Sequence, residues 1–401
     1  MSDIKHVYDV IIIGGGPAGA TAAHDLARQG RDVLLIDRDG RIKPCGGAIP
    51  TKAISEFDIP ASQLKARIGA ARIISPSGNK VSMEIGDIGF VGMVDRDLFD
   101  PFLRERAQKA GAGLMFGTFK TLEYNAAGDV ELVVIRKEDG EELKLVARTV
   151  IGADGANSAV RRAVFGPDVR PPYVFAYHEI VKSPETPNPE KFDANRCDVI
   201  YDGEISPDFY GWVFPHGEHT SVGCGSAHKG HSLKEATRKL REDAGLADAE
   251  TIREEGAPLP LKPMRRWDDG KRVVLAGDSA GVVAPSSGEG IYYAMLTGRL
   301  CGEAVVDLMQ TQKASALRTP RKRFMRDHGR VFFVLGMLQW IWYSSDKRRE
   351  QFVTMCEDAD VQRLTWESYL NKRLVRKEPM AHLRVMFKDL KQLIGLSPRT
   401  S

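Results

Sequence analysis

Short apolar runs that end in glycine or aspartate open the chain and predict alternating strands and helices. Tyr8–Ile13 is almost wholly apolar and predicts a buried strand. Ala20–Arg28 has the pattern of a helix that Gly30 closes, and Asp32–Ile36, followed by Asp37, predicts a second strand. A strand, a helix and a strand in this order are typical of a parallel α/β sheet.

The later pattern divides the chain into further parts. Val130–Ile135 and Leu143–Ala147 flank an Asp-Gly turn and predict a hairpin, and Ser232–Ala244 predicts an amphipathic helix inside a β-rich region. We therefore predict an α/β (α+β) protein with a discontinuous Rossmann-like domain and an inserted antiparallel sheet. The expected boundaries are 1–166 and 266–310 for the first domain, 167–265 for the sheet domain and 311–401 for a helical C-terminal region.

Composition and charge narrow the function classes. The 401 residues are 42% hydrophobic and 28% charged, which is typical of a globular protein. Residues 311–401 carry a net charge of about +10 and the remainder about −7, which favours an anionic membrane surface or a diphosphate over a nucleic acid. Five scattered cysteines without a C-x-x-C pair predict a reducing compartment and no metal site. A strand so near the start predicts no signal peptide, and Val331–Tyr343 is too short to span a bilayer.

The first strand runs into a glycine-rich turn that predicts a dinucleotide site. Gly14, Gly16 and Gly19 form G-x-G-x-x-G between the predicted strand and helix, where backbone N–H groups can meet a pyrophosphate. Asp37, at the end of the second strand, can accept hydrogen bonds from ribose hydroxyls. The motif alone does not distinguish FAD from NAD.

Two later segments resemble the p-hydroxybenzoate-hydroxylase-like flavoproteins. They are Thr149–Ser158, which contains Asp154, and the strand that ends in Gly277-Asp278, which Pro285–Ile291 follows before a long helix. The resemblance implies FAD as the cofactor, with Asp278 accepting from the ribityl chain and the Gly288 and Gly290 amides facing flavin O2. The residues it places against FAD are Gly14, Gly16, Gly19, Asp37, Arg38, Cys45, Gly46, Gly47, Arg96, Asp154, Asp278, Pro285, Gly288, Gly290 and Ile291.

An aromatic hexapeptide and a cysteine-glycine run point to a narrower family. Tyr210, Trp212 and Phe214 alternate in Y-x-W-x-F-P, so they share one face of a strand and form either an apolar wall for an aliphatic chain or ordinary core. Together with Pro-Cys-Gly-Gly in Arg41–Pro50 and with Phe90–Asp100, this hexapeptide resembles the geranylgeranyl reductase family, closest to its bacteriochlorophyll branch.

The resemblance implies an oxidoreductase that saturates three double bonds of a geranylgeranyl chain to phytyl, with NADPH as a transient donor. Its partners would be geranylgeranyl diphosphate or a prenylated pigment, a (bacterio)chlorophyll synthase and the membrane surface, and no nucleic acid. We expect a cytoplasmic protein that lies peripherally on the inner or photosynthetic membrane. Aromatic residues of Val331–Tyr343 between basic clusters suit such a surface, although the same pattern fits a buried helix.

Reduction of an isolated alkene needs a proton as well as a hydride. Cys45, Tyr210 and Glu289 are the candidate catalytic residues, and Cys45, between Pro44 and two glycines, is expected at the reacting face of the flavin. His216 is a further candidate, although we expect an ordinary solvated histidine there.

Three other functions stay open at this stage. A flavin monooxygenase could use the same scaffold, a reductase of membrane diether lipids could share the family, and a prenyl-pigment carrier could have lost its catalysis.

Overall fold

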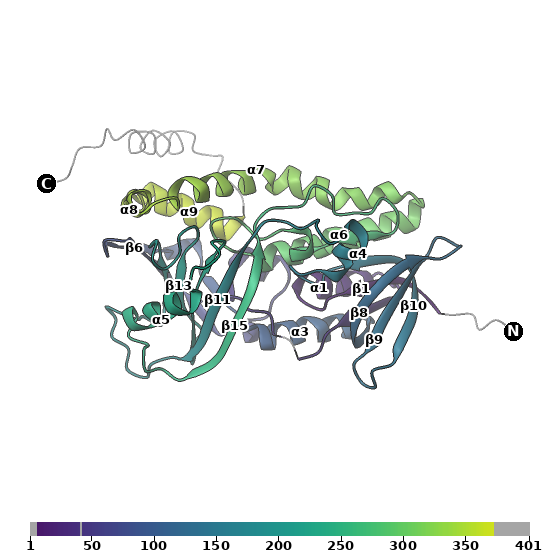
Figure 1. Cartoon of the computed structure of the whole chain (residues 1–401), viewed down its shortest axis with the longest axis horizontal. Coiled ribbons are helices and arrows are strands. Elements are labelled where there is room, and N and C mark those ends of the chain that lie inside the picture. The colour runs from purple at the N-terminus through teal and green to yellow at the C-terminus, as the bar shows by residue number, and fades with distance from the viewer. Residues whose placement is uncertain (1–5, 41, 373–401) are drawn as a thin grey trace. The chain divides into compact units, whose positions relative to one another are not determined.

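The computed structural model describes residues 6–40 and 42–372, and it divides the chain into two compact units (Figure 1). The first unit falls within Met1–Lys43, Arg96–Val174 and Ala257–Phe333, and the second within Pro44–Asp95, Phe175–Gly256 and Val334–Ser401. Arg41 and the end of the predicted basic helical region lie outside the described residues.

A parallel sheet forms the centre of the first unit. Strands β2, β1, β10 and β16 are parallel neighbours, β8 runs parallel to β2 on its other edge, and β9 pairs antiparallel with both β8 and β10. The bounds are β1 Val7–Ile13, β2 Val33–Asp37, β8 Gly113–Tyr124, β9 Val130–Arg136, β10 Glu142–Gly152 and β16 Val273–Leu275. Because β1 and β2 are buried along most of their length, they are apolar throughout rather than alternating.

Helices pack around this sheet and bring the glycine-rich segments together. They are α1 Pro17–Ala27, α3 Arg96–Lys109, α4 Ala159–Phe165 and α6 Ile291–Thr311, with the 3-10 turns η3 Gly277–Ala280 and η4 Ala314–Arg318. Gly298 of α6 packs directly on the backbone of α1, where an added Cβ would lie 2.1 Å from the carbonyl oxygen of Ala18. This close approach of two helices requires a residue without a side chain.

The second unit is built on a seven-stranded sheet in the order β15-β11-β14-β13-β12-β5-β6 and a small sheet β3-β7-β4. The larger sheet comprises β5 Ala70–Ile74, β6 Lys80–Glu84, β11 Tyr173–Lys182, β12 Arg196–Ile200, β13 Gly211–Pro215, β14 His219–Ser226 and β15 Thr251–Pro260. The smaller sheet comprises β3 Ala48–Pro50, β4 Ala66–Ile68 and β7 Val91–Met93. The short helices in this part of the chain are the α-helix α2 Thr51–Glu56 and the 3-10 helices η1 Ala61–Gln63 and η2 Gly86–Ile88.

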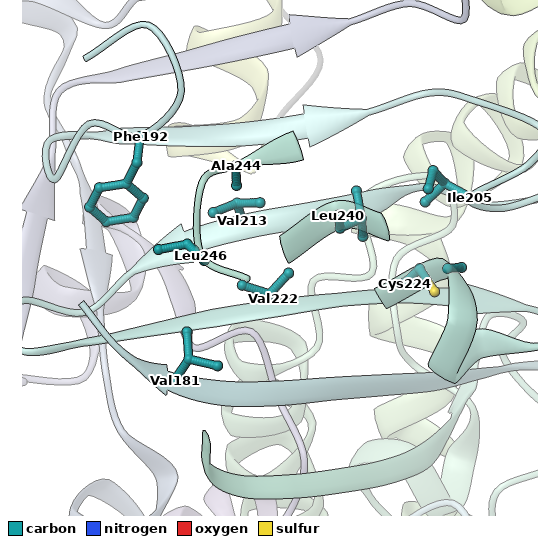
Figure 2. Close-up of a cluster of buried hydrophobic side chains, with 10 residues drawn as sticks. Val181, Phe192, Ile205, Val213, Val222, Cys224, Leu240, Ala244 and Leu246 are labelled. Carbon is teal, nitrogen blue, oxygen red and sulfur yellow. The ribbon is translucent and has the colours of Figure 1, made fainter. Parts of the chain in front are cut away.

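Helix α5, Leu233–Asp243, covers one face of the larger sheet. Ser232 caps its first turn by accepting from the Glu235 N–H, so the amphipathic helix predicted at 232–244 is confirmed. Leu240 of α5 packs with Val213 of β13 and Val222 of β14 in a buried apolar cluster (Figure 2). Val213 therefore points toward α5, and its sequence neighbours in β13 point away from it.

The last described elements are helical, as the sequence predicts. They are α7 Thr319–Trp342, α8 Asp346–Met355 and α9 Ala359–Asn371, and α7 passes from the first unit into the second. None of the helices among the described residues is both long and apolar enough to cross a membrane.

The predicted hairpin at 130–147 is confirmed, since Val134 pairs with Leu143. The seven-stranded sheet includes β5 and β6, and β5 pairs parallel with β12. The sequence pattern did not indicate that these two strands belong to the sheet. The contact units thus group residues 44–95 with the sheet rather than with the Rossmann-like part. The domain boundaries given above stay a prediction.

Candidate functional site

The G-x-G-x-x-G turn of the first unit is packed so tightly that two of its glycines admit no side chain. Gly14 has a φ of +105°, and an added Cβ would lie 2.3 Å from the carbonyl oxygen of Ala153. A Cβ at Gly19 would lie 1.8 Å from the carbonyl oxygen of Gly14. These contacts hold β1, α1 and the turn after β10 together, which is what the motif requires of its first and last glycines.

The middle glycine, Gly16, is less crowded, and an added Cβ there would make only ordinary contacts. The nearest atoms to an added Cβ would be Arg96 Nη2 at 3.7 Å and Asp100 Oδ2 at 3.8 Å. Arg96 is buried and donates to both Asp100 carboxylate oxygens at 2.7 Å. The structure thus places the predicted arginine beside the glycine loop. It also pairs this arginine with Asp100, a partner that the sequence does not predict.

Asp37 ends β2 beside the same loop. One of its oxygens accepts from the Gly15 N–H, and Arg104 of α3 donates to the Gly15 carbonyl at 3.3 Å. Burial raises the pKa of the Asp37 carboxyl, although the Gly15 N–H and Arg104 oppose this. Arg38, the next residue, is exposed. Arg104 was missed, because a helical arginine carries no motif of its own.

Asp154 has a structural role that its sequence position did not reveal. Its carboxylate accepts from Ser158 Oγ at 2.5 Å, from the Ala159 N–H at 2.6 Å and from the Val160 N–H at 3.1 Å. Burial raises the pKa of this carboxyl, and the same three donors oppose the rise. Asp154 therefore caps α4, next to Ala153, on which the glycine loop packs.

Asp278, in η3, is buried and forms an ion pair with Lys43. An added Cβ at Gly290 would lie 3.9 Å from Asp278 Oδ1, and one at Gly277 would touch the Ala18 Cβ at 3.0 Å. The structure thus brings the second glycine-aspartate pair, the start of α1 and the start of α6 together. Lys43 precedes the Pro-Cys-Gly-Gly run and was not singled out from the sequence.

The loop before α6 departs from the prediction in one respect. The Gly288 N–H donates to the carbonyl oxygen of Ala284 at 3.0 Å, so the expectation that it stays available for a ligand is wrong. Ser286 has a φ of +60° and Gly288 one of +64°, which lets the chain close this turn. Pro285 and Ile291, on either side, are buried.

Glu289, a candidate proton donor, stabilises the start of α6. Its Oε1 accepts from the Tyr292 N–H at 2.8 Å, and the side chain is buried. A carboxylate at this end of a helix is favoured by the helix dipole. The contact gives Glu289 a capping function, and its catalytic assignment stays a prediction.

The aromatic hexapeptide lies on β13 in the second unit. The Tyr210 and Trp212 rings are 6.0 Å apart, and the Trp212 and Phe214 rings are 6.3 Å apart. The three side chains therefore share one face, as predicted, while Val213 points into the cluster under α5 (Figure 2). Burial raises the pKa of the Tyr210 hydroxyl far above neutrality, with Tyr343 and Cys45 adding to the effect, which disfavours Tyr210 as an acid.

The Pro-Cys-Gly-Gly run packs against this aromatic face. An added Cβ at Gly46 would lie 3.1 Å from Phe214 Cδ2 and 3.9 Å from Trp212 Nε1. The Gly47 N–H donates to Cys45 Sγ at 3.4 Å, and Cys45 is partly exposed. Two segments about 165 residues apart in the sequence thus form one local site within the second unit.

His216 is not the solvated histidine that the sequence predicts. It is only 5% exposed, and its two ring nitrogens face Asp95 and the Gly46 carbonyl oxygen. The sequence placed it on a solvated loop because a proline precedes it, whereas packing against the cysteine-containing segment buries it.

Comparison with known proteins decides the family. Two protein-family models match the chain. The model described as "Pyridine nucleotide-disulphide oxidoreductase" matches residues 8–172, and the model described as "Lycopene cyclase protein" matches residues 216–389. Geranylgeranyl diphosphate reductase of Rhodobacter capsulatus is 54% identical over 391 residues, which cover 98% of each chain. The chain belongs to the geranylgeranyl diphosphate reductase family. The resemblance inferred from the cysteine-glycine run and the aromatic hexapeptide is thereby confirmed.

Other geranylgeranyl reductases are more distant relatives. The chloroplastic geranylgeranyl diphosphate reductase of Nicotiana tabacum is 36% identical, covering 96% of this chain and 85% of its own. Digeranylgeranylglycerophospholipid reductase of Methanocaldococcus jannaschii is 34% identical, covering 76% and 78%. The family therefore includes proteins named for a free diphosphate and for a lipid.

Solved structures share the fold. A geranylgeranyl bacteriochlorophyll reductase-like protein of Thermoplasma acidophilum has a TM-score of 0.81 at 22% identity, covering 96% of this chain and all of its own. PqsL of Pseudomonas aeruginosa, a probable FAD-dependent monooxygenase, has a TM-score of 0.66 at 16% identity, covering 87% and 100%. The predicted fold class, that of FAD-dependent oxidoreductases of the p-hydroxybenzoate-hydroxylase type, is confirmed.

Proposed function

We propose that the protein is an FAD-dependent geranylgeranyl reductase that uses NADPH to saturate three double bonds of a geranylgeranyl chain, giving phytyl. Its membership of the geranylgeranyl diphosphate reductase family, at 54% identity over the whole chain, carries the proposal. The product would serve (bacterio)chlorophyll synthesis, and contact with a (bacterio)chlorophyll synthase remains a prediction.

The first unit fits FAD. Gly16 precedes the first turn of α1, where the backbone N–H groups would hold a pyrophosphate, and Arg96 lies beside it. Asp37 would accept hydrogen bonds from the adenosine ribose. Asp278, which also pairs with Lys43, would accept hydrogen bonds from the ribityl chain. Bound FAD would supply a hydride at its N5.

The aromatic face of β13 would hold the prenyl chain. Tyr210, Trp212 and Phe214 offer a run of apolar rings with no charged group among them, which suits a C20 hydrocarbon better than a polar acid. The adjacent Cys45 would help to position the chain or deliver the proton that each reduction consumes. Tyr210 would act through its ring rather than its hydroxyl, given the raised pKa of that hydroxyl.

NADPH would bind only transiently. The chain contains one G-x-G-x-x-G, and we assign it to FAD, which leaves no second dinucleotide motif for the donor. Reduced ferredoxin is the alternative donor, and the two are distinguished by which one bleaches the flavin under anaerobic conditions.

A lipid surface is proposed as a further partner. Helix α7 carries exposed Phe333, Met337 and Trp340 at a spacing of four and three residues, so they form one stripe that continues the exposed Arg326 and Arg330. Apolar rings next to cations on a helix face are typical of peripheral attachment to anionic membranes. The predicted inner or photosynthetic membrane is the setting for which we propose this contact.

The deciding experiment is anaerobic incubation of the flavin-loaded protein with NADPH and each C20 substrate, followed by mass spectrometry. The substrates are geranylgeranyl diphosphate, geranylgeranylated (bacterio)chlorophyllide and an archaeal-type diether lipid. We expect hydrogen to be added in pairs, up to three pairs, on one of the first two. Exclusive turnover of the diether lipid would move the protein to the other branch, and oxygen incorporation in air would instead show a monooxygenase. A purified protein that cannot take up flavin would revive the carrier hypothesis.

A further inference from the structure

A buried histidine holds the segment that carries Cys45. His216 follows the last residue of β13, and its Nδ1 lies 2.7 Å from Asp95 Oδ1 while its Nε2 lies 3.1 Å from the Gly46 carbonyl oxygen. A carbonyl oxygen can only accept a hydrogen bond, so Nε2 carries a proton. The other ring nitrogen, Nδ1, makes its hydrogen bond with the Asp95 carboxyl group.

The Gly46–Gly47 peptide continues this chain of hydrogen bonds to the thiol. The carbonyl that accepts from His216 and the N–H that donates to Cys45 Sγ, at 3.4 Å, belong to the same peptide group. Hydrogen bonds on the two ends of one peptide polarise each other. A proton on His216 therefore strengthens the donor that faces the sulfur.

The packing of this segment leaves little freedom for the peptide to turn. Gly47 has a φ of +73°, and an added Cβ would lie 2.4 Å from His216 Cε1 and 2.4 Å from the Val94 carbonyl oxygen. The Val94 N–H donates to the Gly47 carbonyl at 2.9 Å. The imidazole and the Val94 backbone thus both crowd the position that a side chain at Gly47 would take.

Several charged and titratable groups surround the pair. Asp95 follows β7, His219 begins β14, Lys65 precedes β4, and Cys45 lies in the segment before β3. Burial alone would raise the pKa of the Asp95 carboxyl, but the His216 hydrogen bond and the charges of His216, His219 and Lys65 keep that pKa below its ordinary value. An ionised Asp95 can only accept a hydrogen bond, so it holds the imidazole ring in the orientation that faces Gly46.

We propose that His216, paired with Asp95, is a positioning residue that sets the orientation and reactivity of the Cys45 thiol through the Gly46–Gly47 peptide. The consequence for turnover rests on the proposed function, in which Cys45 acts on the prenyl chain. The arrangement itself is a property of the second unit and can be tested without substrate or flavin.

Alkylation of Cys45 by iodoacetamide provides the readout. The other four cysteines are buried, so peptide mass spectrometry of the native protein follows Cys45, with Cys45→Ala as the blank. Asparagine at position 216 can replace the Nδ1 donor toward Asp95 but not reach Gly46, whereas glutamine can place an amide near the Nε2 position. We expect His216→Asn to slow alkylation about fivefold to tenfold, as for the loss of one ordinary hydrogen bond, and His216→Gln to restore most of the rate.

The conservative variant separates positioning from simple structural support, because His216→Gln keeps a donor toward the Gly46 carbonyl oxygen and His216→Asn does not. His228→Asn makes the same change at an exposed histidine and should leave the alkylation rate unaltered. Asp95→Asn removes the carboxylate charge but keeps an oxygen that can accept from the imidazole. It should also slow alkylation, and it provides a test if the histidine variant folds poorly.

Alkylation of His216→Asn, or of Asp95→Asn if the former does not fold, at the wild-type rate would overturn the proposal. An absence of prenyl reduction by the wild-type enzyme would instead refute the proposed function. The two failures are therefore distinguishable.

Discussion

Asp37, a predicted FAD-binding residue, lowers the stability of the ligand-free fold at neutral pH. Its carboxyl is partly buried at the end of β2, and burial raises its pKa despite the Gly15 N–H. Because the folded-state pKa lies above that of an ordinary aspartate, the folded chain is favoured most below the unfolded-state pKa. That advantage is lost as the pH rises through the folded-state pKa. At neutral pH the ionised carboxylate thus destabilises the ligand-free chain.

We expect Asp37→Asn to raise the unfolding midpoint of the flavin-free protein at pH 7, because it removes this charge and keeps an oxygen for Gly15. The gain should shrink as the pH falls toward 4. The same change should weaken FAD binding about tenfold, through loss of a charged acceptor for the ribose. Thermal denaturation across pH and a flavin titration measure both effects. A destabilised variant with normal FAD affinity would show that Asp37 serves the fold rather than the ligand.

At the scale of elements, the contact between α1 and α6 holds the predicted FAD segments together. The two helices approach through Gly298, which lies against the Ala18 carbonyl, and Gly302 lies one turn further along the same face. An added Cβ at Gly302 would meet Leu26 Cγ at 3.5 Å, an ordinary contact, whereas one at Gly298 would overlap the backbone. The pair thus provides a test and its control on one helix.

Gly298→Ala should lower the free energy of unfolding by about 1–3 kcal/mol, because the helices must separate to admit the methyl group. It should also weaken flavin retention, since Ala18 lies in the first turn of the helix that begins after the glycine loop. Gly302→Ala should be neutral or stabilising by up to about 1 kcal/mol, the helix preference of alanine over glycine. Urea denaturation of both variants measures this, and equal stabilities would contradict the packing argument.

On the scale of the whole molecule, α7 presents two different faces. Phe324, His328 and Phe332 are buried, and their rings pack with Tyr292 and Tyr293 of α6. On the opposite face Phe333 is 73% exposed and Trp340 is 78% exposed. One face of α7 is thus part of the core, and contact of the other face with a lipid surface stays a prediction.

The basic cluster expected after α7 is smaller than the sequence indicated. Arg349 is buried, and it donates to the carbonyl oxygens of Pro207 at 2.5 Å and Tyr343 at 2.6 Å. Lys347 is exposed, and Arg348 is partly so. A buried arginine with backbone acceptors supports the fold, so its charge does not count toward attraction to a membrane.

Phe333→Ser combined with Trp340→Ser should reduce binding to anionic phosphatidylglycerol vesicles at least about tenfold, without lowering thermal stability, because both rings are exposed in the free protein. Binding by the wild type should also weaken in high salt, since Arg326 and Arg330 extend the stripe. Leu98→Ser removes an exposed apolar residue from α3 and serves as the control. Vesicle sedimentation gives the measurement, and unchanged binding by the double variant would refute attachment through α7.

Local sequence was sufficient to predict the first strands and helix and the glycine-rich turn between them. Gly14, Gly16, Gly19 and Asp37 could be predicted as a dinucleotide site because a strand, a tight turn and a helix have to follow one another within a few residues, and their contact with FAD stays a prediction. The alternation of Tyr210, Trp212 and Phe214 predicted a shared face for the same local reason. The resemblance carried by the cysteine-glycine run and the aromatic hexapeptide was enough to predict the family, which the comparison with relatives confirms.

Contacts between residues far apart in the sequence became known only from the folded chain. Three such pairs are separated by 121 to 235 positions, and no periodicity encodes them: Lys43 with Asp278, Asp95 with His216, and Gly46 with Phe214. Nor could the sequence show that Asp154 and Glu289 cap helices or that the Gly288 amide is engaged within its own loop. Burial and hydrogen bonding depend on what packs against a residue, and that is set by the whole chain rather than by its neighbours in sequence.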